Sequence, residues 1–496
     1  MAPSDPDQSA TPYADALRRH RDGLRGPFMI PGHSAGVWGS TDRLIDFMGA
    51  EAVALDIPQL LPGVDLEADS PYARSRELAA QAWRAERTWF LTNGASQGNR
   101  MALIAAAAFG DTIVAQRSSH SSFFDGLVVS GLTPRFVHPT IDPVHGIAHG
   151  VTAAQIDDAL DRARDAGAKA AAVAIVSPSY FGAVADVAAI AEAAHRHGVL
   201  LIVDGSWGAH FGFHPGVPAS PTQLGADIVI SSVHKLGGSL TQTAMVHVTP
   251  TAPAGLASQL ERAFRLTEST SPNSLLLASL DIARAELASN RMGLEVSLAA
   301  ARRARELVAA SSVLSLPDDD FLRHPDVIAL DPLHVAVDVR GLGLTGAEAK
   351  ARLGAEHGVF VEIASEHAVV ALVGAGQGAR PELLVDALEA LASDSATDAA
   401  ASPPAPRPPQ PGEAVLTPRE AYFAPSELVA ADAAVGRVST DLLAAYPPGV
   451  PNIVPGERIT AEAVAFLHAV TRRPSGYVRG AVDPLVAHLR VVRETA

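Results

Sequence analysis

Between residues 87 and 243, short apolar runs alternate with helical stretches, and this alternation constrains the fold more than any other feature. The apolar runs are "RTWFLT", "DTIVAQ", "AAVAIVS", "VLLIVD" and "ADIVISS"; stretches such as "QGNRMALIAAAAFG" and "DVAAIAEAAHRHG" separate them. Strands that are apolar along their whole length are typical of a parallel sheet covered by helices on both faces. The pattern therefore predicts an α/β domain, and in such sheets ligands bind at the carboxyl ends of the strands.

The remaining sequence predicts further structural units. After "SPNSLLLASLDIARAELASN" the pattern is helical, and the runs "HVAVDVR" and "AVVALVG" then indicate a small α+β unit. The stretch "DSATDAAASPPAPRPPQPGE" is rich in Ala, Pro and Ser, which is typical of an extended linker. We expect a flexible lead-in at 1–25, a large domain at 26–290, a small α+β domain at 291–393, a linker at 394–413 and a C-terminal α/β segment at 414–496.

Length and charge exclude several classes of protein. The 496 residues are enough for two or three domains, and a net charge of −16 argues against a nucleic-acid partner. No apolar run approaches the roughly 18 residues needed to cross a bilayer, and the N-terminus does not resemble a secretory signal. The chain has no cysteine, which excludes disulfides and thiolate metal sites and fits a cytoplasmic protein. We expect neither a membrane partner nor a metal site.

The stretch "SSVHKLGGSLTQT" places Lys235, one of only three lysines in the chain, just after an apolar run. Burying an ammonium group is costly, so a covalent role would explain this position. Asp204 ends the preceding run "VLLIVD", His120 follows "DTIVAQ", and the turn at 93–96 follows "RTWFLT". If the strands are parallel, these residues converge on one edge of the sheet.

This set of residues suits pyridoxal phosphate. A lysine amine can hold the aldehyde as a Schiff base, and an aspartate can keep the pyridine nitrogen protonated. A glycine-containing turn at a helix N-terminus offers N–H groups to the phosphate. Each feature alone has a simpler explanation, since a strand-end aspartate is often a helix cap and a lone histidine is usually structural. The combination of Asp204 and Lys235 on adjacent strand ends favours the cofactor.

Seven motifs carry a resemblance to a known family. They are "PGHSAG" (31–36), "TNGASQGN" (92–99), "VDGSWGAHFGFHP" (203–215), "GADIVISSVHK" (225–235), "LTQTA" (240–244), "SPNSLLLASLD" (271–281) and "YPPGVPNIVPGE" (446–457). In this order they resemble the bacterial Orn/Lys/Arg decarboxylases of fold-type I, over nearly the whole chain after about Gly26. The length is similar to that of the short members, which lack the N-terminal wing domain.

The resemblance implies a fold-type I large domain that binds pyridoxal 5'-phosphate and decarboxylates a basic L-amino acid to its amine and CO2. The reaction would pass through an external aldimine and a quinonoid; arginine is the first candidate substrate, and lysine or ornithine the next. Lys235 resembles the Schiff-base lysine, Asp204 the partner of the pyridine nitrogen and His120 the residue stacked on the ring. His234 or Lys235 would return the proton to Cα. The further cofactor contacts implied are Gly94, Ala95, Ser96, Ser206, Ser232, His234 and Thr270.

The resemblance also implies substrate residues and a partner subunit. His33, Trp207 and Glu362 would contact the substrate, and the stretch 270–273 would reach the site of a neighbouring subunit in a homodimer or larger assembly. The sequence departs from the family pattern at Ser121, where a lysine is usual, at Gly205, where a glutamate is usual in the short members, and at Ser365, where an aspartate is usual. These departures leave a modified or longer cationic substrate open.

Three alternatives stay open at this stage. An aminotransferase or aldolase can share the fold, because fold does not determine the reaction. A decarboxylase of this kind can also use oxygen, for which the sequence has no marker. From a different class, the chain could be a catalytically silent regulatory relative, against which the intact pair Asp204 and Lys235 argues.

Overall fold

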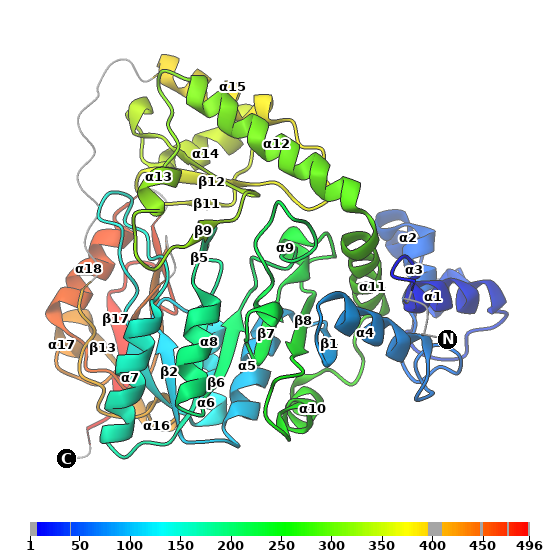
Figure 1. The fold of residues 1–496 in the computed structure, drawn as a ribbon, viewed down its shortest axis with the longest axis horizontal. Helices are drawn as coiled ribbons and strands as arrows, with labels where there is room; N and C mark the ends of the chain where they lie inside the picture. The colour runs from blue at the N-terminus through cyan, green and yellow to red at the C-terminus, as the bar shows by residue number, and fades with distance from the viewer. Residues whose placement is uncertain (1–6, 40, 395–408, 447–449, 474–475, 495–496) are drawn as a thin grey trace.

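The computed structural model describes residues 7–39, 41–394, 409–446, 450–473 and 476–494. A large domain carries the central sheet, the yellow-green small domain lies above it, and the orange to red C-terminal segment lies against one side (Figure 1). The predicted linker at 394–413 falls mostly outside the described residues. None of the helices in these ranges is long and apolar enough to span a membrane.

The central sheet has seven strands in the order β1-β8-β7-β6-β4-β2-β3. Strand β8 pairs antiparallel with both β1 and β7, whereas all the other neighbours are parallel. Strands β1 and β7 therefore run in the same direction, and their carboxyl ends lie at the same edge as those of β2, β4 and β6. This confirms the predicted α/β fold with a mostly parallel sheet. The strands are β1 (Arg87–Leu91), β2 (Thr112–Gln116), β3 (Thr133–Val137), β4 (Ala170–Val176), β6 (Leu200–Asp204), β7 (Ile228–Ser231) and β8 (Ala244–Val248).

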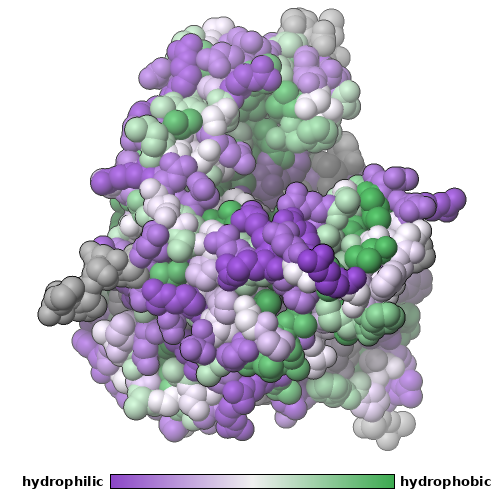
Figure 2. Space-filling view, turned by 90° about the vertical axis from the view of Figure 1, so that its right-hand side faces the viewer, coloured by the Kyte–Doolittle hydropathy of each residue, from purple (hydrophilic) through white to green (hydrophobic). Residues whose placement is uncertain are grey.

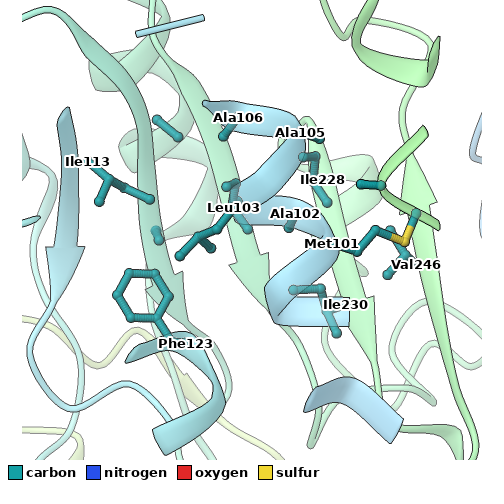
Figure 3. Packing of buried hydrophobic residues seen from close by; sticks show 14 of the residues in the cluster. Met101, Ala102, Leu103, Ala105, Ala106, Ile113, Phe123, Ile228, Ile230 and Val246 are labelled. Carbon is teal, nitrogen blue, oxygen red and sulfur yellow. The ribbon is translucent and has the colours of Figure 1, made fainter. Parts of the chain in front are cut away.

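Helices cover both faces of this sheet. On one face lie α5 (Gly94–Ala106), α6 (Ser121–Ser130) and α10 (Leu256–Thr267); on the other lie α7 (Ala153–Asp165) and α8 (Val187–Arg196). Met101 of α5 points toward Val246 of the sheet, and Leu103 points toward Ile113 and Phe123 (Figure 3). Gly98 permits this close approach, because a Cβ there would lie 2.8 Å from a methyl carbon of Ile230. The close packing holds the first turn of α5 against the carboxyl ends of the strands.

The lead-in predicted at 1–25 is wrong for residues 12–23, which form helix α1 (Pro12–Gly23). Tyr13 and Leu17 of this helix are buried in the core. The Tyr13 N–H donates to the Asp281 carboxylate at 3.0 Å, and Arg284 in turn donates to the Gln8 carbonyl at 2.6 Å. Asp281 and Arg284 lie on α11 (Ser274–Ser289), so the order of this segment comes from partners far along the chain.

The small domain is built on an antiparallel sheet in the order β10-β12-β11, packed against α12 (Arg291–Ala310), α14 (Gly346–His357) and α15 (Pro381–Asp394). Its strands are β10 (His334–Asp338), β11 (Ile363–Ala364) and β12 (Ala368–Leu372). The C-terminal segment contains the pair β13 (Ser426–Ala430) and β17 (His488–Val492), a three-stranded sheet of β14 (Leu443–Tyr446), β15 (Pro451–Ile453) and β16 (Tyr477–Arg479), and helix α18 (Ala461–Thr471). The boundaries proposed between these units stay predictions.

The shorter elements complete the described chain. They are η1 (Ser34–Gly36), α2 (Asp42–Met48), α3 (Ala50–Leu55), α4 (Pro71–Ala82), β5 (Ala183–Val184), η2 (Pro221–Gln223), α9 (Val233–Leu236), α13 (Asp318–Phe321), β9 (Ala329–Leu330), η3 (Arg340–Leu342), α16 (Pro418–Phe423) and α17 (Ala431–Ala434).

A buried ion pair joins the C-terminal segment to the large domain. The Arg117 guanidinium donates to both carboxylate oxygens of Glu457, at 2.5 and 2.8 Å. Both side chains are at least nine-tenths buried, and the Arg117 guanidinium also lies over the Phe136 ring. Because Arg117 follows β2 directly, this pair holds the C-terminal segment close to the edge where the strands end.

Candidate active site

Two adjoining pockets open at the carboxyl edge of the sheet. The inner pocket, about 620 Å³, lies over the strand ends, and the outer pocket, about 790 Å³, lies between the large domain, the small domain and the C-terminal segment. Four residues line both pockets: His120, Tyr180, Trp207 and Lys235. Any molecule that fills both pockets therefore passes these four side chains.

Lys235 projects from α9, which directly follows β7. Its ammonium lies 3.6 Å from the centroid of the Trp207 ring and makes no hydrogen bond or ion pair with the described residues. Burial lowers the pKa of Lys235 to about 8, while the charges of Asp204 and Glu362 oppose this shift. The amine is therefore close to neutral at moderately alkaline pH, the state in which it can act as a nucleophile.

Asp204 ends β6, the strand next to β7, and is 8% exposed. The Asn99 side chain donates to one of its carboxylate oxygens at 3.0 Å, and the Ser206 N–H donates to the other at 3.1 Å. The Ser206 hydroxyl donates to the latter oxygen as well. Three donors hold the carboxylate in one orientation at the inner pocket.

His120 is the N-cap residue of α6. Its Nδ1 accepts from the Ser122 N–H at 3.2 Å and lies 2.8 Å from the Ser122 hydroxyl. Burial lowers the pKa of His120, while Asp204 raises it and Lys235 lowers it further. The lowered pKa favours the neutral imidazole, and the contacts with Ser122 fix the ring's orientation at the junction of the two pockets.

The first turn of α5 forms one wall of the inner pocket. Gly94 adopts a φ of +69°, which favours glycine, and its N–H donates to the Gln242 carbonyl at 2.8 Å. Ala95 and Ser96 follow, and the first N–H groups of a helix have no partner within it. Together with the helix dipole, these N–H groups form a binding site for an anion such as a phosphate. Ser232 and His234 line the same pocket.

The outer pocket combines aromatic rings with a single lining carboxylate. Tyr446 and Tyr477 of the C-terminal segment stack with ring centroids 5.0 Å apart. The carboxylate belongs to Glu362, which is exposed, and Lys350 donates to the backbone carbonyl of the same residue at 2.6 Å. Aromatic faces and a carboxylate are groups that bind organic cations.

The structure brings most of the predicted site residues together. Those that line one or both pockets are Gly94, Ala95, Ser96, His120, Asp204, Ser206, Trp207, Ser232, His234, Lys235 and Glu362. His33 and Thr270 line neither pocket of this chain. Instead, His33 Nε2 lies 3.1 Å from Asp56, whose other carboxylate oxygen accepts from Asn273 at 3.4 Å. The motif "PGHSAG" and the stretch 270–273 therefore lie beside one another, outside the lining of both pockets.

Several pocket residues were missed in the sequence. Asn99 stands one helical turn after Ala95, so helical periodicity could have placed it on the same face. Tyr180 follows the end of β4, so the strand-end argument applied to Asp204 could have found it. Tyr446 and Tyr477 carry no local signal, because only the packing of the C-terminal segment brings them to the pocket.

Comparison with known proteins identifies the family. The sequence model of the Orn/Lys/Arg decarboxylase major domain matches residues 11–327, and that of the Orn/Lys/Arg decarboxylase C-terminal domain matches residues 408–475. The chain is 33% identical over 493 residues to an arginine decarboxylase of Halalkalibacterium halodurans, covering 98% of both chains. It is 32% identical over 494 residues to an arginine decarboxylase of Bacillus subtilis, covering 98% of this chain and 99% of that one.

Solved structures agree at the level of the fold. The lysine decarboxylase LdcF of Francisella novicida superimposes with a TM-score of 0.80 at 20% identity, covering 98% of this chain and 82% of that one. Lysine decarboxylase A of Pseudomonas aeruginosa superimposes with a TM-score of 0.81 at 20% identity, covering 97% of this chain and 80% of that one. The resemblance carried by the sequence motifs is confirmed, and the chain belongs to the Orn/Lys/Arg decarboxylase family.

Proposed function

We propose that this protein is a pyridoxal-phosphate-dependent decarboxylase of a basic L-amino acid, with arginine as the first candidate. The observation that carries the proposal is the inner pocket, which brings together the unpaired Lys235 amine, just after β7, and the triply hydrogen-bonded Asp204 carboxylate at the end of the adjacent β6. Arginine is placed first because the full-length relatives at 32–33% identity are named arginine decarboxylases.

The inner pocket fits pyridoxal phosphate on three counts. Lys235 has a lowered pKa and would hold the aldehyde, while Asp204 would face the ring nitrogen. The first turn of α5, with Ser232 and His234, would hold the phosphate. When bound, the cofactor supplies an electron sink for the bond that breaks at Cα.

The chain's own residues position the substrate and control protons. Asp204 would hold a proton on the ring nitrogen of the bound cofactor, and the His120 ring covers the junction of the pockets. The buried Trp207 ring would keep water away from the reacting carboxylate, which would favour loss of its charge. His234 and Lys235 are the candidates for returning a proton to Cα.

The outer pocket would hold the cationic end of the substrate. Glu362 offers the carboxylate, and the stacked Tyr446 and Tyr477 rings offer aromatic faces. Ser365 is buried and has no carboxylate. In this chain Glu362 is therefore the residue that would pair with the positive charge of the substrate.

A second copy of the chain would complete the site. The N-terminal segment exposes large apolar side chains, with Phe28 at 92%, Phe47 at 86% and Leu60 at 70% exposure. Figure 2 looks onto this end of the molecule and shows green hydrophobic patches among the hydrophilic surface. Asp56 contacts both His33 and Asn273. Asn273 belongs to the stretch 270–273, which the family resemblance expects to reach the site of a neighbouring subunit. A homodimer would cover the apolar side chains, and the molar mass in solution tests it.

The test of the function compares arginine, lysine and ornithine at matched concentration, with mass detection of CO2, amine and any aldehyde. We expect amine and CO2 in equal amounts, with arginine fastest and a several-fold higher KM in Glu362→Gln. Glu389→Gln is a control, because Glu389 is an exposed glutamate of the same small domain and does not line the pocket. Faster turnover of a neutral or acidic amino acid would overturn the proposal, and aldehyde in place of amine would indicate an oxygen-using reaction.

A further inference from the structure

Three potential metal ligands from distant parts of the chain meet at a place outside the lining of both pockets. Asp142 and His149 lie in the loop between β3 and α7, and His324 follows α13 (Figure 1). One donor atom from each lies within 4.8 Å of the other two. The closest approaches are 3.7 Å from Asp142 Oδ2 to His149 Nε2 and 3.9 Å from the same oxygen to His324 Nε2.

These distances are too long for hydrogen bonds and suit the edges of a coordination shell. With metal–ligand bonds of about 2.0–2.2 Å, the ligands of a tetrahedral ion are roughly 3.3–3.6 Å apart. The distances from Asp142 Oδ2 to His149 Nε2 and to His324 Nε2 exceed this range by only a few tenths of an ångström. Small shifts of the side chains would therefore place one ion between the three groups.

The His149 ring provides an independent sign of a missing partner. Its side chain is fully buried, and neither ring nitrogen has a hydrogen-bond partner. The ring packs against Phe321, with centroids 5.0 Å apart, and against His324, with centroids 4.8 Å apart. Leaving a buried polar atom unsatisfied costs free energy, whereas a metal ion at Nε2 would satisfy it.

The surroundings orient the carboxylate ligand. Asp142 Oδ1 accepts the N–H groups of Val144 and His145, at 2.7 and 3.1 Å. His145 Nδ1 lies 2.9 Å from Asp142 Oδ2, and its other ring nitrogen lies 3.3 Å from Asp338. Groups that hold a ligand from behind in this way are typical of protein metal sites.

We infer that Asp142, His149 and His324 bind one divalent transition-metal ion, with Zn²⁺ first in order. Two imidazoles and a carboxylate suit zinc and related first-row ions better than Mg²⁺ or Ca²⁺, which prefer oxygen ligands. The ion ties the 138–150 loop to the segment that enters the small domain. The sequence alone predicted no metal site, because that expectation rested on the lack of cysteine.

The site also borders the wall of the active-site pockets. His149 lines a small cavity together with Tyr180 and Phe181, and Tyr180 lines both pockets. The ion therefore acts as a structural clip behind Tyr180. It takes no part in the reaction proposed above, and it is tested without measuring that reaction.

The experiment uses tag-free, cofactor-loaded protein dialysed against a chelator and then into metal-free buffer. After addition of Zn²⁺ and removal of the excess, we expect about one zinc per chain by elemental mass spectrometry and a higher thermal midpoint than without zinc. Co²⁺ in place of Zn²⁺ should give visible absorption bands from the bound ion. His324→Ala should weaken Zn²⁺ binding at least about 100-fold, because it removes a ligand, whereas loss of an outer-shell partner typically costs 10–100-fold.

Two variants keep the outcome clear. His324 is partly exposed, with 18% of its side chain accessible, so His324→Ala should fold as wild type by circular dichroism. His138→Ala is the matched control, because His138 lies exposed in the same chain region and is not part of the cluster. Less than about one-fifth of a zinc per wild-type chain would overturn the inference, as would equal zinc binding in wild type and His324→Ala.

Discussion

The Lys235 ammonium faces the Trp207 ring at 3.6 Å, and no described carboxylate forms an ion pair with it. A lysine paired with a carboxylate would keep its proton, whereas this one loses it more easily because burial penalises the charge. The aromatic contact offsets part of that penalty without neutralising the amine. This relationship suits an amine that must react rather than one that stabilises the fold.

We predict that Lys235→Ala abolishes decarboxylation and removes the visible absorption band of bound pyridoxal phosphate. The reason is that no other lysine lines the inner pocket. Lys350→Ala is the matched control, since Lys350 lines only the outer pocket and should keep the band. A wild-type spectrum and activity in Lys235→Ala would mean that another group holds the cofactor.

The rate of cofactor loading should depend on pH through the pKa of Lys235. Burial lowers this pKa from 10.5 to about 8, so the neutral amine predominates in the folded chain above pH 8. The loading rate of the cofactor-free protein should rise about tenfold per pH unit below pH 8 and level off above it. Because the folded pKa is the lower one, this group makes the cofactor-free protein more stable as pH rises from about 8 to 10.5.

Stopped-flow absorbance at several pH values checks this expectation, with a free lysine derivative measured in parallel. The free amine should show no plateau before its own, higher pKa. A loading rate that keeps rising in step with the free amine to pH 10 would contradict the lowered pKa.

Asp204→Asn should reduce kcat by about 10²–10³-fold, in the range found when one preorganised electrostatic contact is removed. The change keeps the shape of the side chain and removes only its charge, so cofactor affinity should fall much less than kcat. Asn99→Ala removes one hydrogen-bond donor to Asp204 and should reduce kcat about tenfold. Steady-state kinetics with cofactor titration separate the two effects, and an unchanged kcat in Asp204→Asn would exclude its assigned role.

Glu457→Gln should destabilise the protein by about 3–5 kcal/mol, because it leaves the Arg117 guanidinium buried and unpaired. The double variant Arg117→Met, Glu457→Gln should be more stable than the sum of the single changes predicts. Arg162→Gln is the control, since it breaks an exposed pair with Asp158 on a helix surface and should cost less than about 1 kcal/mol. Urea unfolding is measured for wild type, the two single variants Glu457→Gln and Arg117→Met, the double variant and Arg162→Gln. Equal losses of stability for Glu457→Gln and Arg162→Gln would mean that the buried pair does not hold the C-terminal segment.

The central sheet and the inner pocket follow from local patterns in the sequence. Apolar runs separated by helices predict a parallel sheet, and in a parallel sheet every strand ends at the same edge. For that reason Asp204, Lys235, His120 and Gly94 could be grouped without knowing any distance. The first turn of α5 was predictable as well, since a glycine turn after a strand and before a helix creates an anion site wherever it occurs.

Contacts between segments far apart in the chain could be found only in the tertiary structure. The stacked Tyr446 and Tyr477, the burial of α1 against Asp281 and the cluster of Asp142, His149 and His324 have no local pattern that marks them. Periodicity records which face of a strand or helix is buried, but it does not record what covers that face. Which segment covers a buried face depends on the fit of side chains that packing brings together. The sequence by itself therefore determined the central sheet and the edge that carries the reactive residues. The tertiary structure decided the outer pocket and the candidate metal site.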